Sequence, residues 1–302
     1  MTKFTVDAKS LAELKQLCGQ ETDALLRKGG EWGLDEATLR RWLVARKGNV
    51  ADAARDLKAH AVWRASYVPQ GRIQEHEIRH ELDQAKAFLP GTDRDGRPLC
   101  VVVVSRHEMK DADASKRYIA YSLDCAAAMG AKTPGWDGKM SGIFDLRGLK
   151  ASNCDFATLK AVFDLLQNHY PERLHKLWLF CAPVIFYGLW KLVYPFIDPV
   201  TREKVQFVYE KDAEKDFTEG FEPCMLPPEL QPHGTGRWIS VEERYKLLLA
   251  EQEAAAEAYG AVAVAANPGT NGANGANDHV AAAASDAHAS GAAPMHSVQV
   301  VA

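Results

Sequence analysis

The stretch at residues 169–209, HYPERLHKLWLFCAPVIFYGLWKLVYPFIDPVTREKVQFVY, contains two short apolar runs with a longer apolar segment between them. The runs at 176–181 and 205–209 are too short for helices and rich in aromatic and branched side chains, as buried strands are. Between them, ten of the thirteen residues at 185–197 are apolar or aromatic, which is long enough for a helix. A strand, a helix and a second strand form a βαβ unit, so the stretch predicts parallel strands covered by helices.

The same alternation extends toward the N-terminus. Apolar runs at 99–104 and 141–146 precede the quoted stretch, and helical patterns at about 113–129 and 155–169 lie between the runs. Four continuous apolar runs that alternate with helices indicate an α/β fold with a mainly parallel sheet.

The residues before the sheet have the pattern of a helical subdomain. Between 8 and 67, apolar side chains recur at helical spacing, and Asp35 and Asn49 are candidate N-caps. Gly48 is a candidate helix end. The charged segment EHEIRHELDQAKAFL at 75–89 also has a helical pattern.

The composition separates a mixed part of the chain from a low-complexity end. The chain has 302 residues and a formal net charge of −4, so no basic excess indicates a nucleic-acid partner. From Glu251 to Ala302 there are 19 alanines and no Lys or Arg, too little apolar area to offset chain entropy. We therefore expect a helical N-terminal subdomain at 1–75, an α/β domain at 76–240, a C-terminal helix at 241–256 and a disordered tail at 257–302.

Cysteine usage and hydropathy indicate the compartment. Six cysteines are scattered along the chain without a CxxC pair, which is typical of reduced cytosolic thiols. The N-terminal MTKFTVDAKS lacks the apolar run of a signal peptide, and no stretch of about 18 apolar residues predicts a transmembrane helix. We expect a soluble cytoplasmic protein.

Catalytic motifs are absent or out of context. Residues 76–80, HEIRH, match HExxH, in which two His on one helix face bind zinc and the Glu acts as general base. Arg79 would place a cation beside that metal, and no third ligand stands out, so a zinc hydrolase is a remote alternative. The DRDG at 93–96 lacks the later ligands of a calcium loop, and a tight turn is expected there. No P-loop, GxSxG or GxGxxG context is found, so we predict neither an enzyme nor a metal protein.

The segment at 185–197 allows two interpretations. Its apolar side chains go all round a helix, Lys191 is its only charged residue, and it is too short to span a bilayer. One interpretation is a helix buried in the core. The other is a helix that covers a lipid cavity with one face and touches a membrane with the other.

Several motifs in a fixed order carry a family resemblance. They are LRRWLVARKGNV at 39–50, TDRDGRP at 92–98, FDLRG at 144–148, YPER at 170–173, and PFIDPVT at 195–201 followed by Lys204. Together they resemble the CRAL-TRIO lipid-binding domain, most closely its phosphatidylinositol-transfer branch, over about residues 30–235. The resemblance implies an α/β sheet floor under a hydrophobic cavity, preceded by a helical subdomain. In that family the cavity holds one lipid's acyl chains beneath a gate helix that opens at a membrane.

The resemblance also assigns a head-group site. By motif, the contacts with an inositol phosphate fall on Arg46, Lys47, Glu172, Arg173, Thr201 and Lys204. The chemistry fits a phosphodiester beside a ring of hydroxyls, because Arg173 and Lys204 supply positive charge and the Thr201 hydroxyl donates and accepts. Glu172 can accept sugar hydroxyls, or pair with Lys47 and tie the two subdomains together.

The gate helix of the family corresponds to residues 185–197. Its gate and membrane contacts are predicted at Phe186, Leu189, Trp190, Val193 and Phe196. A hinge motion around Gly188 and Pro195 would open the gate, and serine at Trp190 and Phe196 is expected to slow transfer while the fold stays intact.

Two features depart from the family pattern. Phosphatidylcholine-binding members carry hydroxyl residues on the strand before FDLRG, where this chain has Met140 and Gly142 on either side of Ser141. This weakens the case for phosphatidylcholine as a second ligand. The closing segment at 223–236, PCMLPPELQPHGTG, lacks the paired glycine that is usual in the family.

The function that the resemblance implies is non-enzymatic. We expect a monomer that binds phosphatidylinositol without any other cofactor, transfers it between membranes and presents it to a lipid kinase. Its partners would be the phospholipid and a transient membrane surface, with no nucleic acid. The alternative is a carrier of a hydrophobic small molecule, such as a tocopherol, retinoid or carotenoid, on the same fold.

Overall fold

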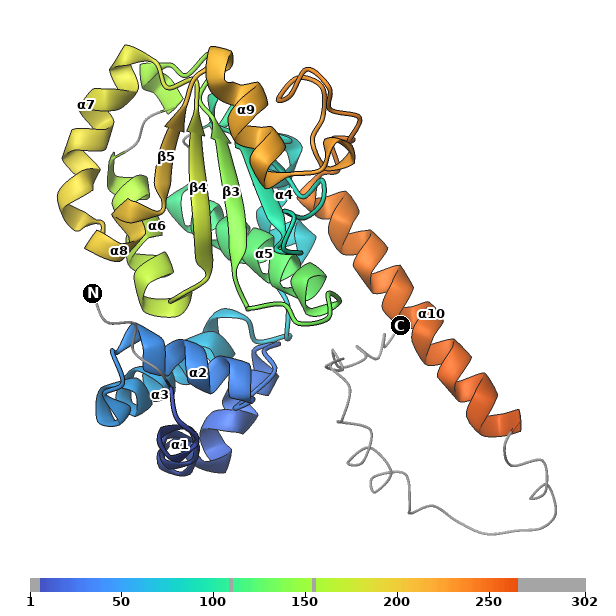
Figure 1. The fold of residues 1–302 in the computed structure, drawn as a ribbon. Helices are drawn as coiled ribbons and strands as arrows, with labels where there is room; N and C mark the ends of the chain where they lie inside the picture. The colour runs from blue at the N-terminus through green and yellow to red at the C-terminus, as the bar shows by residue number, and fades with distance from the viewer. Residues whose placement is uncertain (1–5, 109–110, 154–155, 266–302) are drawn as a thin grey trace, which may run out of the picture.

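A computed structural model of the chain describes residues 6–108, 111–153 and 156–265, and Figure 1 shows a helical N-terminal part beside an α/β part. The N-terminal helices are α1 (Ala8–Lys28), α2 (Glu36–Ala45) and α3 (Val50–Tyr67). The predicted N-caps are confirmed, because the Asp35 carboxylate accepts a hydrogen bond from the Thr38 backbone N–H at 2.7 Å. Asn49 caps α3 in the same way, through the Asp52 N–H.

The three N-terminal helices share a buried apolar core. Its largest members are Leu14, Leu26, Trp42, Leu43 and Leu57. The predicted helical N-terminal part is therefore confirmed, whereas its boundary at residue 75 stays a prediction.

The sheet of the described residues has five strands in the order β1-β2-β3-β4-β5. The strands are β1 (Ala87–Phe88), β2 (Leu99–Val103), β3 (Met140–Asp145), β4 (Leu174–Phe180) and β5 (Val205–Val208). Strands β2 to β5 pair in parallel, and β1 pairs antiparallel with β2. The register aligns Val101 with Ile143 and Ile143 with Trp178. The predicted α/β fold with a mainly parallel sheet is confirmed.

Helices cover both faces of the sheet (Figure 1). They are α5 (Ala112–Ala131), α6 (Phe156–His169), α7 (Val184–Val193), α8 (Pro199–Glu203) and α9 (Glu210–Gly220). Short 3-10 turns are η2 (Val104–Arg106), η3 (Ala151–Asn153), η4 (Tyr194–Phe196) and η5 (Pro223–Met225). Because side chains alternate along a strand, β4 directs Trp178 toward Phe217 of α9 and Leu179 toward Phe186 of α7.

The predicted helix at 75–89 is confirmed as helical turns only as far as Asp83 and is wrong beyond it. The segment forms η1 (Glu75–Ile78), α4 (Arg79–Asp83) and then β1. Ala85 ends the helical path with a left-handed φ of 47°, and a buried ion pair between Glu81 and Lys86 holds the turn. Phe88 then pairs with β2 as an edge strand. Tertiary pairing has overridden a helical pattern of moderate strength.

The last described helix, α10 (Val241–Ala265), packs on α5 with its first half, and its second half extends away from the body (Figure 1). Tyr245 of α10 stacks on Tyr121 of α5, with ring centroids 4.9 Å apart. The helix continues past the predicted end at residue 256, so the expected disorder at 257–265 is wrong. Alanine has the highest helix propensity, which explains the extension. The remaining predicted tail, 266–302, lies outside the described residues.

Candidate functional site

An apolar cluster lies between α7 and the sheet. We name its main members the inner cluster: Phe144, Leu146, Leu177, Leu179, Phe186, Leu189, Trp190, Val205 and Phe207. The Phe207 ring lies near its centre, with its centroid 6.3 Å from that of Phe186 and 5.7 Å from that of Trp190. Aromatic and aliphatic side chains of this kind form the lining that apolar ligands prefer.

The other side of α7 and the segment after it are apolar and exposed. We name these side chains the outer face: Val184, Ile185, Leu192, Tyr194, Phe196 and Val200. Val184 is 88% exposed and Leu192 is 59% exposed. Exposed apolar side chains that gather in one segment are typical of a contact site for a membrane or another molecule. One side of the segment is therefore packed in the core, whereas the predicted membrane contact of the exposed side stays a prediction.

The predicted gate residues divide between these two sides. Phe186 and Val193 are buried, and Leu189 and Trp190 are partly buried against the inner cluster, whereas Phe196 is 49% exposed. Phe186 and Val193 lie inside the protein, and their predicted membrane contact stays a prediction. The predicted single helix is corrected, since α7 ends at Val193 and η4 continues it as a 3-10 turn.

Several polar contacts hold α7 and η4 in place. The Gln167 side-chain amide of α6 donates to the Phe196 carbonyl at 2.7 Å. The hydroxyls of Tyr187 and Tyr209 share a hydrogen bond that joins α7 to the residue before α9. A Cβ added at Gly188 would meet no atom within 4 Å. The hinge at Gly188 stays a prediction, and the open space around this glycine is compatible with it.

Three predicted head-group residues lie in two neighbouring segments. Lys204 Nζ lies 3.8 Å from Glu172 Oε2, and both side chains are about three-quarters buried or more. Thr201 lies in α8, directly before Lys204, and its N–H donates to Asp198 Oδ1 at 2.9 Å. The structure therefore brings Glu172 and Lys204 together beside α8. The alternative pairing of Glu172 with Lys47 is replaced by this one.

Arg173 has different partners from those predicted. Its Nη1 donates to the Gly138 carbonyl at 2.8 Å, and its guanidinium lies 5.5 Å from the Trp136 ring and 6.0 Å from the Trp32 ring. Burial lowers its pKa. These contacts direct the side chain to the helical subdomain and to the loop before β3, and its assignment to the head group stays a prediction.

Arg46 and Lys47 lie at the turn between α2 and α3. Arg46 Nε donates to Asp56 Oδ2 at 2.5 Å, and its guanidinium lies 5.8 Å from the Trp42 ring. Lys47 has a left-handed φ of 51°. The structure thus pairs Arg46 within the helical subdomain, and the part of this turn in head-group binding stays a prediction.

A buried polar network that the motifs did not reveal joins the helical subdomain to the sheet domain. Its members are Glu31, Arg41, His60, Arg64, Asp124, His169 and Tyr170. Arg41 and Arg64 are buried, and burial near Arg173 lowers the pKa of Arg41 to about 9. A signal was present in the sequence, because His60 and Arg64 share the helical face of the core residues Leu57 and Ala61.

The turn before β2 is confirmed, and it engages Ser141. The Asp93 carboxylate accepts backbone hydrogen bonds from Asp95 and Arg97 at 3.0 and 2.9 Å, the pattern of an Asx turn. Ser141 Oγ, which is buried, donates to the same carboxylate at 2.9 Å. The one hydroxyl on this part of β3 is therefore bound within the protein.

The HEIRH segment does not form the single helix that a zinc site needs. His76 lies in η1 and His80 in α4. His80 Nε2 lies 3.7 Å from Glu108 Oε2. Among the described residues, no group of three or more His, Cys, Asp or Glu side chains is arranged to hold a metal ion.

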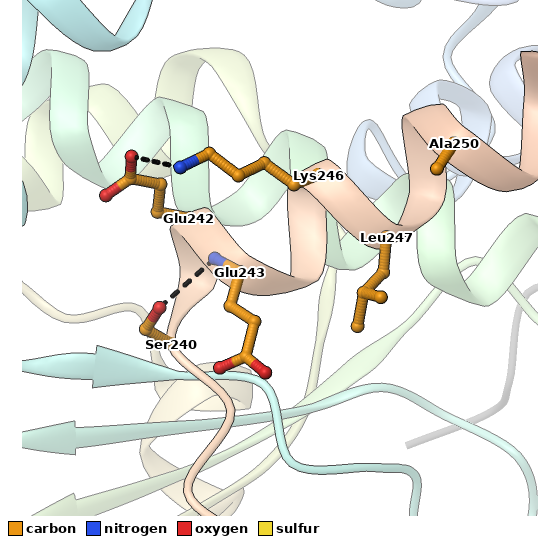
Figure 2. A pocket seen from close by; sticks show the side chains of 6 residues that line it. All are labelled: Ser240, Glu242, Glu243, Lys246, Leu247 and Ala250. Carbon is orange, nitrogen blue, oxygen red and sulfur yellow. Dashed lines mark hydrogen bonds and ion pairs between the residues drawn. The ribbon is translucent and has the colours of Figure 1, made fainter.

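Two surface hollows lie away from α7. One, of about 450 Å³, lies at the start of α10, where Glu242 pairs with Lys246 at 2.9 Å and the Glu243 N–H donates to Ser240 Oγ (Figure 2). The other, of about 480 Å³, lies on α9 beside Lys211 and Lys215. Charged side chains contribute to the lining of both hollows, and Leu247 and Ala250 also line the first.

Comparison with known proteins identifies the fold. Residues 82–231 match the CRAL/TRIO domain. The crystal structure of Sfh5 superposes with a TM-score of 0.55 over 82% of this chain and 98% of that chain, at 16% identity. In the part of the chain that the structure describes, no helix has the length and apolarity needed to cross a bilayer.

Two curated relatives extend this likeness. The SEC14 cytosolic factor of Candida glabrata is 29% identical over 80% of this chain and 82% of its own length. The phosphatidylinositol transfer protein CSR1 of Eremothecium gossypii is 30% identical over 43% of this chain and 30% of its own length. The chain spans less than half the length of the first curated relatives that it matches. The predicted family resemblance is confirmed.

Proposed function

We propose, from the match of residues 82–231 to the CRAL/TRIO domain, that the chain binds phosphatidylinositol and transfers it between membranes. The observation that carries the proposal is the segment α7–η4, which is apolar on two sides. One side packs on the inner cluster, and the other presents the outer face to solvent. A core helix needs only the first of these, whereas a lipid gate needs both.

The energetics of acyl chains support a gated cycle. Burial of each CH₂ group contributes about 0.8 kcal/mol, so a lipid seated on the inner cluster does not leave spontaneously into water. Exchange requires α7 to move at a membrane, where the outer face exchanges water for lipid. The contacts that α7 would give up are mainly non-directional ring contacts, such as Phe186 and Trp190 against Phe207.

The residues beside α8 suit an inositol phosphate head group. We propose that Lys204 neutralises the phosphate, that the Thr201 hydroxyl hydrogen-bonds to it, and that Glu172 accepts ring hydroxyls. The 3.8 Å separation of Lys204 from Glu172 supports this division, because Lys204 can bind a phosphate without losing a short hydrogen bond. Arg46 and Lys47 would complete the site from the turn after α2. We assign Arg173 to the subdomain interface instead.

The wider proposal concerns the setting of this activity. We propose a cytoplasmic monomer that performs no catalysis, needs no cofactor besides its lipid, and presents that lipid to a lipid kinase. The family likeness supports the lipid-carrying part, and the name of the relative CSR1 supports the choice of phosphatidylinositol.

Transfer of phosphatidylinositol between labelled vesicles tests the proposal. Lys204→Ala removes the cation beside α8 and is expected to slow transfer about tenfold or more, the factor that corresponds to ~1.5 kcal/mol for a charged hydrogen bond. The matched control is Lys215→Ala on the exposed surface of α9, which should transfer at the wild-type rate.

The two alternatives give different results. If wild type transfers no phosphatidylinositol and the purified protein absorbs in the visible or near-ultraviolet range, the ligand is a hydrophobic small molecule on the same fold. Wild-type transfer that is equally fast in Lys204→Ala would place the head group elsewhere.

A further inference from the structure

One face of α3 holds the last turn of α6. His60, Trp63 and Arg64 are three or four residues apart and therefore share a side of the helix. His60 Nδ1 lies 3.1 Å from His169 Nδ1, and the Trp63 ring stacks on His169 with centroids 3.5 Å apart. His60 Nε2 also lies 2.8 Å from Glu31 Oε1. The helical subdomain therefore contacts His169, the residue before Tyr170, from two sides.

Arg64 of the same helix hydrogen-bonds to Tyr170. The Arg64 side chain is 2% exposed, and its Nη2 donates to Asp124 Oδ2 at 2.6 Å. Its Nη1 donates to the Tyr170 hydroxyl at 3.2 Å, and its Nε donates to the Gly29 carbonyl at 2.7 Å. The Tyr170 hydroxyl in turn donates to Asp124 Oδ1 at 3.2 Å. One buried guanidinium thus joins α3, α5 and the residue after α6.

The residues on either side of Glu172 are held. The Pro171 carbonyl accepts a hydrogen bond from Arg41 Nη1 at 3.4 Å, and the Arg173 carbonyl accepts one from the first N–H of β3 at 2.8 Å. Glu172 between them has a left-handed φ of 57°, which a residue other than glycine seldom adopts. Such a conformation persists where the surroundings over-determine it, and it occurs often at functional sites.

The backbone, more than the ion pair, sets the position of the Glu172 carboxylate. Its distance of 3.8 Å from Lys204 Nζ exceeds that of a hydrogen bond, and a pair of this kind contributes little to holding a side chain in place. The direction of the Glu172 side chain therefore depends on the hydrogen bonds that Arg64 makes with Tyr170 and Arg41 makes with Pro171.

We propose that Arg64, Asp124 and Tyr170 are positioning residues for the lipid head group: from the subdomain interface they hold Glu172 beside Lys204. This inference rests on the proposed function. It assigns the helical subdomain a part in head-group selection that does not require any of its side chains to touch the lipid.

The test is a double-substitution cycle in the vesicle assay with phosphatidylinositol. Tyr170→Phe removes the clamped hydroxyl and keeps the ring, and we expect transfer to slow about fivefold. In a Glu172→Gln background the same substitution should have no further effect, because its action passes through the Glu172 carboxylate. The matched control is Tyr67→Phe, since the Tyr67 hydroxyl at the end of α3 is buried without a hydrogen-bond partner.

Each outcome has one meaning. Unchanged transfer in Tyr170→Phe, or an equal loss in both backgrounds, overturns the positioning role and leaves the proposed function standing. Absence of transfer by wild type overturns the proposed function itself. If circular dichroism shows that Tyr170→Phe is unfolded, Arg64→Lys replaces it, because lysine keeps the charge but cannot bond Asp124 and Tyr170 with one fork. The same non-additive loss is then expected.

Discussion

Two regions of the molecule are held by different kinds of contact. The interface around Arg64 is held by charged hydrogen bonds, whereas the α7–η4 segment is held mainly by apolar contacts. The interface buries charged groups whose hydrogen bonds are directional, and Arg64 joins three segments of the chain at once. The α7–η4 segment is bound mainly by rings packed against rings, with exposed apolar side chains on its other side. The interface includes Tyr170, two residues before Glu172, and the α7–η4 segment is followed by α8, which has Lys204 as its C-cap.

The difference teaches which of the two regions is able to move. A buried charge network has one fully satisfied arrangement, and departure from it leaves charges unpaired in a poor solvent. Apolar contacts are non-directional, so an acyl chain can replace an aromatic ring at little cost. In the proposed gating, the Arg64 interface would therefore stay fixed while α7 opens.

The largest expected effect is a loss of stability when the hydrogen-bond network of the Arg64 interface is removed. Arg64→Met leaves the Asp124 carboxylate buried without its main partner, and we expect a loss of about 3–5 kcal/mol in the free energy of unfolding, measured with urea. Arg55→Met on the exposed side of α3 is the control and should cost under about 1 kcal/mol, because its ion pairs are at the surface. Similar losses in both variants would show that the network does not hold the subdomains.

The next effect concerns the outer face. Paired substitution of Leu192 and Phe196 by Ser should slow vesicle transfer about tenfold and leave the unfolding midpoint unchanged, because both side chains are exposed. Val62→Ser is the matched control, since Val62 is 61% exposed on α3, away from this segment. The outer face has no role at the membrane if the pair transfers as fast as this control.

A smaller effect appears as the pH falls. Burial, together with the neighbouring His60, lowers the pKa of His169 to about 4, below the value of about 6.5 in an unfolded chain. The unfolded state therefore binds more protons between these values, so stability is complete above pH 6.5 and falls as the pH decreases toward 4. Urea midpoints across this range should fall for wild type and fall less for His169→Phe, which keeps the stacking on Trp63. Parallel curves would refute the assignment.

The smallest expected effect comes from a substitution that makes the backbone of α7 less flexible. Gly188→Ala meets no atom within 4 Å and adds helix propensity, so it should stabilise the protein by about 0.5–1 kcal/mol. If Gly188 lies at the hinge, transfer should slow about twofold at the same time. A stabilised variant with undiminished transfer would move the hinge to the ends of α7.

Much of the fold could be predicted because its signals are local. The apolar runs at 99–104, 141–146, 176–181 and 205–209 overlap the parallel strands, and the caps Asp35 and Asn49 begin helices as expected. These features depend on side-chain periodicity and on backbone hydrogen bonds within a few residues. The prediction of a helix over 75–89 was wrong beyond Asp83, because the end of the helix depends on the pairing of β1 with β2 and on the buried ion pair of Glu81 and Lys86.

The candidate site was only partly predictable. Motif order brought Glu172 and Lys204 to one site, and the structure pairs them. The motif could not predict the direction of the Arg173 side chain, which lies near Trp32 and Trp136 at the subdomain interface. Direction depends on the backbone angle at each residue, and the left-handed Glu172 sets this residue apart from its neighbours.

By itself, the sequence determined the α/β class, the helical N-terminal part and the family resemblance, because strand and helix periods and motif order are properties of the chain alone. Only the tertiary structure decided which side of α7 is buried, since apolar residues all round a helix contain no preference for one face. It alone also decided the partners of Arg64, because Asp124 and Tyr170 are distant in sequence and meet only when α3, α5 and α6 pack together. Contacts between remote segments depend on the whole fold, and these contacts separate the fixed interface from the segment proposed to open.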